Sequence, residues 1–298
     1  MPKKFFLDID GKQSSTVLLA GMGRSGTTWL SEIINYNNTF RYMFEPFNYE
    51  RVKEAEPFGA RKYLRPESTD ERFIFPAARI LTGRIRNPWI DKRNRRFIAT
   101  RRLIKVVRAN LFLRWLYVNF PAIPIVFTIR HPLAVIHSAQ KLGWKPALPL
   151  LLQQKELVSD FLEDFLCYLP SLKDEFEKYI FSWCIEHYVL FRQFNYEDLC
   201  MVFYEDMRSQ PEREVRRVFD FLGLTFEKSF MDAWAKPSFT SRKTETGEKL
   251  IRKDWLENIS DERFERGQEI LKMFNLHKIY SDDFVPNHEA VRNLMAEE

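Results

Sequence analysis

Residues 16–30, TVLLAGMGRSGTTWL, place glycines, hydroxyl side chains and one cation directly after an apolar run. These residue types are those of a phosphate-binding loop between a strand and a helix. A nucleotide kinase loop reads G-x-x-x-x-G-K-[ST]. Here Gly21 and Gly26 hold the glycine positions, but Thr27 stands where a kinase has its lysine, and the cation is Arg24. The loop is therefore predicted to bind an anion in a way that differs from a kinase.

Backbone N–H groups are the main donors expected in this loop. The first N–H groups of a helix lack partners within the helix and lie at its positive end, so they bind anions. Gly23 and Gly26 would let such an anion approach the backbone closely. Three hydroxyl side chains add further donors: Ser25, Thr27 and Thr28. The alternative is a strand-to-helix turn that binds no ligand.

Arg130 and Ser138 lie eight residues apart, a spacing that is a weak signal by itself but lets both side chains converge on one anion. Arg130 ends an apolar run, and Ser138 falls on the second turn of the helix expected after it. Ligands of open α/β sheets bind outside the carboxyl ends of the strands. A forked guanidinium and a hydroxyl together suit a terminal phosphate. The alternative is a strand-end arginine in a salt bridge and a capping or core serine.

The elements that position these residues follow from the apolar pattern. Runs rich in β-branched residues alternate with stretches of helical periodicity, which predicts βαβ units and a parallel sheet. Strands are expected at residues 16–21, 39–44, 102–107, 123–130 and 199–204. Helices are expected at 26–36, from 132 to about 142, in two pieces within 155–194 split near Pro170, and at about 211–223. Beyond residue 225 the pattern indicates helices and loops only.

Composition and charge narrow the class of protein. The 298 residues are 45% hydrophobic and 29% charged, as expected for one large globular domain. Three cysteines are too few for a disulfide framework or a zinc site. Net charge is +5, and residues 84–108 carry ten Lys or Arg against one Asp. This block indicates an anionic partner, whether nucleic acid, a sulfated or phosphorylated substrate, or a nucleotide, unless it is a solvated basic face.

Targeting signals are missing from the sequence. The first residues, MPKKFFLDIDGKQSS, form neither a signal peptide nor a membrane anchor, and no apolar run reaches 18 residues. We therefore expect a cytoplasmic enzyme without a transmembrane segment, and peripheral contact with a membrane stays open. The sequence carries no signal for an oligomeric state.

Several motifs resemble one enzyme family. GMGRSGTTWL resembles the phosphosulfate loop of the sulfotransferases that use 3′-phosphoadenosine-5′-phosphosulfate (PAPS). TIRHPLAVIHSA resembles the 3′-phosphate motif of that family, with Arg130 and Ser138 at the matching positions. MVFYEDMRSQPEREVRRVFDFLGL resembles its fifth strand and following helix, and FEPFN at 44–48 looks like a segment of the carbohydrate-type members. The resemblance spans about residues 16 to 224.

The resemblance implies a fold and a reaction. The fold is α/β, a P-loop-like three-layer sandwich with a central parallel sheet of about five strands flanked by helices. One domain is expected over 1–298, with a nucleotide-binding core at about 14–224, a helical insertion at about 144–196 and a C-terminal region at 225–298. PAPS would donate its sulfuryl group to a hydroxyl of an acceptor, a sugar or glycolipid, without a metal. Arg24 would stabilise the charge that grows on the bridging oxygen as the S–O bond breaks.

Glu45 is the candidate for the catalytic base. It follows the second expected strand, and the resemblance to carbohydrate-type sulfotransferases assigns it the acceptor proton. The small-molecule branch uses a histidine after the third strand, and residues 97–122 contain none. The alternative for Glu45 is a structural carboxylate that pairs with Arg41 or another basic neighbour.

Further candidates surround the expected nucleotide. Lys105 or Arg108 could supply a second cation, and strand alternation predicts that they lie on opposite faces, so that only one contributes. By resemblance, Trp29 could stack on the adenine, or it could be a core residue. Ser241 and Arg242 resemble the C-terminal loop of the family that closes over the nucleotide. His131 is expected to orient the loop or have no role, and His137 to lie on a helix surface. The aromatic helices at 144–194 could form an acceptor pocket and lid, or simple core.

Two other functions compete with sulfuryl transfer. A P-loop kinase with a degenerate loop would need a carboxylate for magnesium, and Glu205 and Asp206 are its candidates. A nucleic-acid-binding protein would use residues 84–108, where Trp89 and Phe97 are the only aromatic residues. The sequence predicts neither a nucleic-acid partner nor a metal ion.

Overall fold

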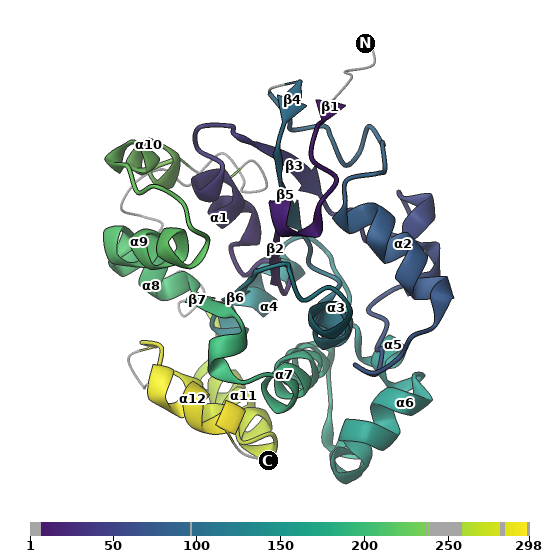
Figure 1. Cartoon of the computed structure of the whole chain (residues 1–298). Helices are drawn as coiled ribbons and strands as arrows, with labels where there is room; N and C mark the ends of the chain where they lie inside the picture. The colour runs from purple at the N-terminus through teal and green to yellow at the C-terminus, as the bar shows by residue number, and fades with distance from the viewer. Residues whose placement is uncertain (1–6, 96, 237, 239–257, 281–283, 297–298) are drawn as a thin grey trace.

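The computed structural model describes residues 7–95, 97–236, 238, 258–280 and 284–296. Its centre is a five-stranded sheet of the order β3-β5-β2-β6-β7, in which every neighbouring pair is parallel (Figure 1). The strands are β2 (Thr16–Gly21), β3 (Phe40–Phe44), β5 (Arg101–Lys105), β6 (Ile125–Ile129) and β7 (Cys200–Phe203). The predicted α/β fold with a central five-stranded parallel sheet is confirmed.

The strands are buried on both faces, which explains why they appear in the sequence as nearly continuous apolar runs. All residues of β2, β3, β6 and β7 are buried. A second, two-stranded sheet pairs β1 (Leu7–Asp8) with β4 (Ile98–Ala99), and the sequence analysis did not predict it. Pairs of two residues give no periodic signal, so this sheet could not be read from the pattern.

Helices cover the two faces of the sheet, and each face has its own apolar cluster. Along β2, Val17 and Leu19 belong to one cluster, whereas Leu18 and Ala20 belong to the other. The first face is covered by α1 (Thr27–Ile34), α8 (Tyr204–Ser209), α9 (Pro211–Phe221) and α10 (Met231–Trp234). The second is covered by α2 (Glu71–Leu81), α3 (Leu113–Asn119), α4 (Pro132–Gln140), α7 (Glu175–Gln193), α11 (Asp261–Met273) and α12 (His288–Ala296). The result is the predicted arrangement of three layers (Figure 1).

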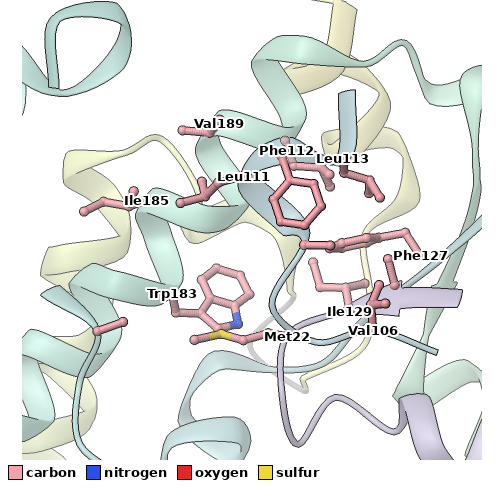
Figure 2. Close-up of a cluster of buried hydrophobic side chains, with 14 of the residues drawn as sticks. Met22, Val106, Leu111, Phe112, Leu113, Phe127, Ile129, Trp183, Ile185 and Val189 are labelled. Carbon is pink, nitrogen blue, oxygen red and sulfur yellow. The ribbon is translucent and has the colours of Figure 1, made fainter. Parts of the chain in front are cut away.

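Helix α7 forms much of the core on the second face. Figure 2 shows Trp183, Ile185 and Val189 of this helix in the same cluster as Phe127 and Ile129 of β6. Asp174 caps the helix, because its side chain accepts a hydrogen bond from the Glu177 N–H at 2.9 Å. Fourteen residues of α7 are buried, so this helix belongs to the core.

The segment before α7 departs from the predicted single helix. It consists of α5 (Leu148–Leu152), α6 (Lys155–Leu157), a π-helical turn over Val158–Leu162 and a 3₁₀ helix over Glu163–Ser171. Pro170 lies inside the last of these turns and cannot donate a backbone hydrogen bond. None of the helices in the described part of the chain is both long and apolar enough to cross a bilayer.

Candidate functional site

A cavity of about 510 Å³ opens at the carboxyl ends of the five strands. Because parallel strands end at the same edge, segments distant in sequence meet there. Seven of the described lining side chains are Lys or Arg and two are Glu. The lining residues are Gly23, Arg24, Gly26, Thr27, Thr28, Trp29, Phe44, Glu45, Asn48, Glu50, Arg51, Trp89, Lys105, Val107, Arg108, Arg130, Leu142, Trp144, Tyr204, Arg208, Lys236 and Ser238.

The loop between β2 and α1 forms the middle of the cavity wall. Gly26 is the N-cap of α1 and has a φ of 87°. A Cβ atom at this position would lie 2.6 Å from Cδ2 of Tyr204, so only glycine fits without a shift. Arg24 also has a positive φ, 76°, which is uncommon for a side chain of this size. The predicted loop and helix start are therefore present, and the helix N-terminus faces the cavity.

The two predicted anion motifs meet in this structure. Arg24 Nε donates a hydrogen bond to Ser138 Oγ at 2.9 Å, and Arg130 Nη1 donates one to the Arg24 carbonyl at 3.1 Å. Arg130 has no ion pair with any described carboxylate, and its guanidinium carbon lies 4.3 Å from the ring centroid of Tyr204. The alternative interpretation, a strand-end salt bridge, is therefore wrong for the described residues. Arg24 and Arg130 therefore lie together at the cavity wall, whereas Ser138 contacts Arg24 and does not itself line the cavity.

Glu45 forms an ion pair with Lys105, and both side chains are buried. The second oxygen of the Glu45 carboxylate accepts a hydrogen bond from the Val107 N–H at 3.2 Å. Glu45 has a φ of 50°, so its backbone is in the left-handed region that disfavours side chains. The alternative interpretation of Glu45 named Arg41 or another basic neighbour as its partner: the partner is Lys105, whereas Arg41 Nε donates to Asp91 Oδ1 at 2.9 Å.

Lys105 and Arg108 both line the cavity, so the prediction that only one faces it is wrong. Strand alternation would hold only if the strand reached residue 108, but β5 ends at Lys105. The chain then turns, and Glu45 binds the turn through the Val107 N–H. Both cations therefore reach the same space as Glu45.

Comparisons with known proteins decide the family. A model of the sulfotransferase domain family matches residues 14–272. The chain belongs to this family. Sulfuryl transfer to a hydroxyl acceptor is thus the reaction class that family membership supports. A search of curated protein sequences finds no match to this chain.

Solved structures share the sulfotransferase fold at low sequence identity. A sulfotransferase domain from the curacin biosynthetic pathway is 14% identical, covers 86% of this chain and 95% of its own, and has a TM-score of 0.50. One from the olefin synthase of Synechococcus PCC 7002 is 14% identical, with 89% and 98% covered and a TM-score of 0.47. Mouse sulfotransferase SULT7A1, solved in complex with PAP, is 17% identical, with 97% and 90% covered and a TM-score of 0.44.

Other residues of the sulfotransferase loop have mixed environments. Thr27 and Thr28 are buried and line the cavity. The hydroxyl of Ser25 is buried without a hydrogen-bond partner among the described residues, and Ser25 does not line the cavity. Trp29 is only 7% exposed, yet it lines the cavity, while its Nε1 donates to the Trp234 carbonyl at 3.1 Å. It therefore combines a core position with a face toward the site. Ser241 and Arg242 lie outside the described residues.

The carboxylates that a kinase would require are bound elsewhere in this sulfotransferase. Glu205 accepts hydrogen bonds from the His131 N–H at 3.0 Å and from the Tyr280 hydroxyl at 3.1 Å. Asp206 pairs with His288 at 2.6 Å, and neither carboxylate lines the cavity.

Burial and the nearby charge of Arg130 lower the pKa of His131 to about 3, so this ring is neutral near pH 7.

The basic block at 84–108 does not form one surface. Arg102 is fully buried and pairs with Asp8 at 2.7 Å. Lys92 lies over Trp89, with its Nζ 3.4 Å from the ring centroid, whereas Lys105 and Arg108 line the cavity. Five cations of the block are exposed, so part of it is a solvated basic face: Arg84, Arg86, Lys92, Arg93 and Arg95.

Sequence analysis missed several residues of the cavity wall. Tyr204 and Arg208 follow β7, and Arg51 lies in the turn after Glu45. Leu142 and Trp144, in the loop after α4, also line the cavity. No described residue of α7 lines it, so α7 does not supply the expected acceptor pocket. The position of Tyr204 and Arg208 just after an apolar strand was an available signal, because every parallel strand in the sheet ends at this edge.

Proposed function

We propose that this sulfotransferase moves the sulfuryl group of PAPS to a hydroxyl of a sugar or glycolipid. The observation that carries the proposal is the convergence of Arg24, Arg130 and Ser138 beside a helix N-terminus. Facing them across the same cavity is a buried carboxylate, Glu45, paired with Lys105. One end of the cavity therefore suits a polyanionic donor and the other suits removal of a proton.

The donor end of the cavity lies at β2, β6 and β7. Four of its lining residues are cations, Arg24, Arg130, Arg208 and Lys236, and none is a carboxylate. PAPS supplies the sulfuryl group and carries negative charge on its phosphosulfate and its 3′-phosphate. The backbone N–H groups of the loop and the hydroxyls of Thr27 and Thr28 would bind the phosphosulfate. Arg130 and Ser138 would bind the 3′-phosphate through charge-assisted hydrogen bonds.

Arg24 is the cation best placed to act during transfer. Its hydrogen bond to Ser138 holds the guanidinium beside the loop before any ligand arrives. A fixed cation at the bridging oxygen stabilises the transition state more than the ground state, because charge grows there as the bond breaks. Lys105 and Arg108 line the same cavity and add two further cations. We therefore propose that arginine and lysine side chains neutralise the developing charge.

The acceptor end of the cavity lies at β3 and β5. Glu45 would take the proton of the attacking hydroxyl, and Lys105 and the Val107 N–H hold its carboxylate in place at the cavity wall. The wall there also contains Asn48, Glu50 and Arg51, whose polar groups could bind neighbouring hydroxyls. A surface of this polarity supports an acceptor with several hydroxyl groups, as in a sugar. A cytoplasmic location stays a prediction from the sequence.

The test of the donor is calorimetric titration with adenosine 3′,5′-bisphosphate, without metal, and separately with ATP and magnesium. We expect micromolar or tighter binding of the bisphosphate, lost in Arg130→Ala and retained in Arg72→Ala, whose side chain is 80% exposed on α2. Preference for ATP with magnesium would contradict the proposal. The acceptor is then tested by transfer of radiolabelled sulfate from PAPS to sugars, glycolipids and small alcohols. Transfer only to small alcohols would reject the acceptor class.

A further inference from the structure

Arg208, near the end of α8, has an unusual environment for an arginine. It is 9% exposed and lines the cavity. Its guanidinium carbon lies 5.3 Å from the ring centroid of Trp29 and 5.4 Å from that of Trp234. Its Nε is buried without a hydrogen-bond partner, and its side chain has no ion pair among the described residues. A buried cation is thus left with aromatic faces as its only described partners.

Arg208 lacks a counter-ion among the described residues. An arginine side chain keeps its charge in proteins, so burial alone does not remove the need for a counter-ion. Burial lowers the pKa of Arg208; Tyr204 acts in the opposite direction, and the positive charge of Arg130 adds to the lowering. Arg130 and Arg208 lie beside neighbouring rings, because the Tyr204 ring next to Arg130 is 5.6 Å from the Trp29 ring next to Arg208, centroid to centroid. An anion that reaches both guanidinium groups would be their counter-ion and could accept the missing hydrogen bond of Arg208 Nε.

The position of Arg208 identifies which anion this is. Arg130 follows β6 and Arg208 follows β7, and these two strands are neighbours in the sheet. The loop that would bind the phosphosulfate follows β2, on the other side of β6. The carboxylates that line the cavity, Glu45 and Glu50, follow β3 at the far end of the sheet. We propose that Arg208 is a second guanidinium ligand of the 3′-phosphate of the donor, opposite Arg130, an inference that rests on the proposed function.

The experiment measures how strongly the site prefers a ligand with a 3′-phosphate. Wild type, Arg208→Gln and Arg208→Lys are titrated with adenosine 3′,5′-bisphosphate and with adenosine 5′-monophosphate, which differ only in that phosphate. We expect Arg208→Gln to reduce the ratio of the two affinities by about tenfold or more, because it removes a charge-assisted contact to one ligand only. Arg208→Lys keeps the charge and should retain an intermediate ratio.

The experiment has a control variant, and the results that would contradict it have different meanings. Arg216→Gln, on the next helix, removes a half-exposed arginine that does not line the cavity and should leave the ratio unchanged. If Arg208→Gln and Arg208→Lys weaken both ligands equally, or weaken neither, Arg208 does not bind the 3′-phosphate and the inference is overturned. If wild type itself fails to bind the bisphosphate, the proposed donor is wrong, which is a different result from an unchanged ratio. Thermal unfolding of each variant identifies loss of fold.

Discussion

Glu45 and Lys105 form the pair on which proton transfer would depend. The carboxylate is fixed from two sides, by Lys105 and by the Val107 N–H. Its positive φ keeps the backbone in a conformation that costs free energy, and such strain often occurs at functional sites. Replacing Glu45 with Gln keeps the shape of the side chain and removes its basicity.

We therefore expect Glu45→Gln to lower turnover roughly 10²-fold or more while leaving the affinity for adenosine 3′,5′-bisphosphate within about twofold of wild type. Turnover is measured with PAPS and the acceptor, and affinity by calorimetry. Glu54→Gln, a carboxylate paired with Arg79 outside the cavity, is the matched control. Unchanged turnover in Glu45→Gln would remove Glu45 as the base.

Arg24 should act more on the transition state than on the bound nucleotide. The bisphosphate lacks the sulfuryl group, so it cannot report the contact that develops during transfer. We expect Arg24→Ala to lower turnover by roughly 10²- to 10³-fold and to weaken bisphosphate binding much less. Ser138→Ala, which removes the hydrogen-bond acceptor of Arg24 Nε, should have a smaller effect on turnover. Equal losses in affinity and turnover would argue that Arg24 only binds the nucleotide.

At the scale of elements, a buried ion cluster links β3 and β5 to the segments outside the sheet. Arg41 of β3 bonds to Asp91 through two oxygens, at 2.9 Å and 3.0 Å, and Arg102 of β5 pairs with Asp8 of β1. Both arginines are fully buried. The cluster explains why Arg102, one cation of the basic block, contributes nothing to the cavity.

Breaking this cluster should affect stability and spare the donor site. Asp91→Ala leaves a buried guanidinium short of its main counter-ion, so we expect the free energy of unfolding to fall by about 3–5 kcal/mol. Urea denaturation measures this loss. Bisphosphate affinity at low temperature should stay near that of wild type, because Asp91 does not line the cavity. Arg41 Nη1 also lies 3.4 Å from Asp8 Oδ2, so a loss below about 1 kcal/mol would mean that Asp8 alone can neutralise Arg41.

The sequence predicted elements well where burial controls the pattern. The five strands were located to within about two residues, since each is an apolar run buried on both faces. The helix expected before Pro170 was wrong, because apolar periodicity does not distinguish a regular helix from a series of tight turns. Arg24 could be predicted as the cation of the loop, whereas Arg130 and Ser138 were predicted by resemblance to a family motif, because an Arg and a Ser eight residues apart are a weak signal alone. The environment of Arg208 could not, because it depends on Trp29 and Trp234 packing around it from other elements.

At the scale of the whole molecule, the two apolar clusters share one sheet. Because every strand contributes to the packing of both faces, neither face is expected to unfold alone. We propose that the chain is one domain, and we expect a single cooperative unfolding transition by circular dichroism and by calorimetry. Two separated transitions would indicate that part of the chain folds independently.

Buried histidines should make the stability of the molecule depend on pH. Burial lowers the pKa of His187 to about 4, whereas an unfolded histidine titrates near 6.5. Between these values the unfolded state binds the proton, so the contribution of His187 to stability is present above about pH 6.5 and is lost as pH falls toward 4. The difference in unfolding free energy between wild type and His187→Phe should therefore fall by up to about 1.4 kcal/mol per pH unit in this window. A difference independent of pH would contradict a neutral buried ring.

The cavity wall contains three of the seven tryptophans of the chain, Trp29, Trp89 and Trp144. Trp144 is 44% exposed and lies against Gly23, where a Cβ atom would be 2.8 Å from its ring. A ligand that reaches the loop must displace water from this indole or move it. Indole emission responds to such a change in polarity, so the fluorescence of the unlabelled protein should report occupancy of the loop. The contact between Trp144 and Gly23 thus places an intrinsic fluorophore at the loop.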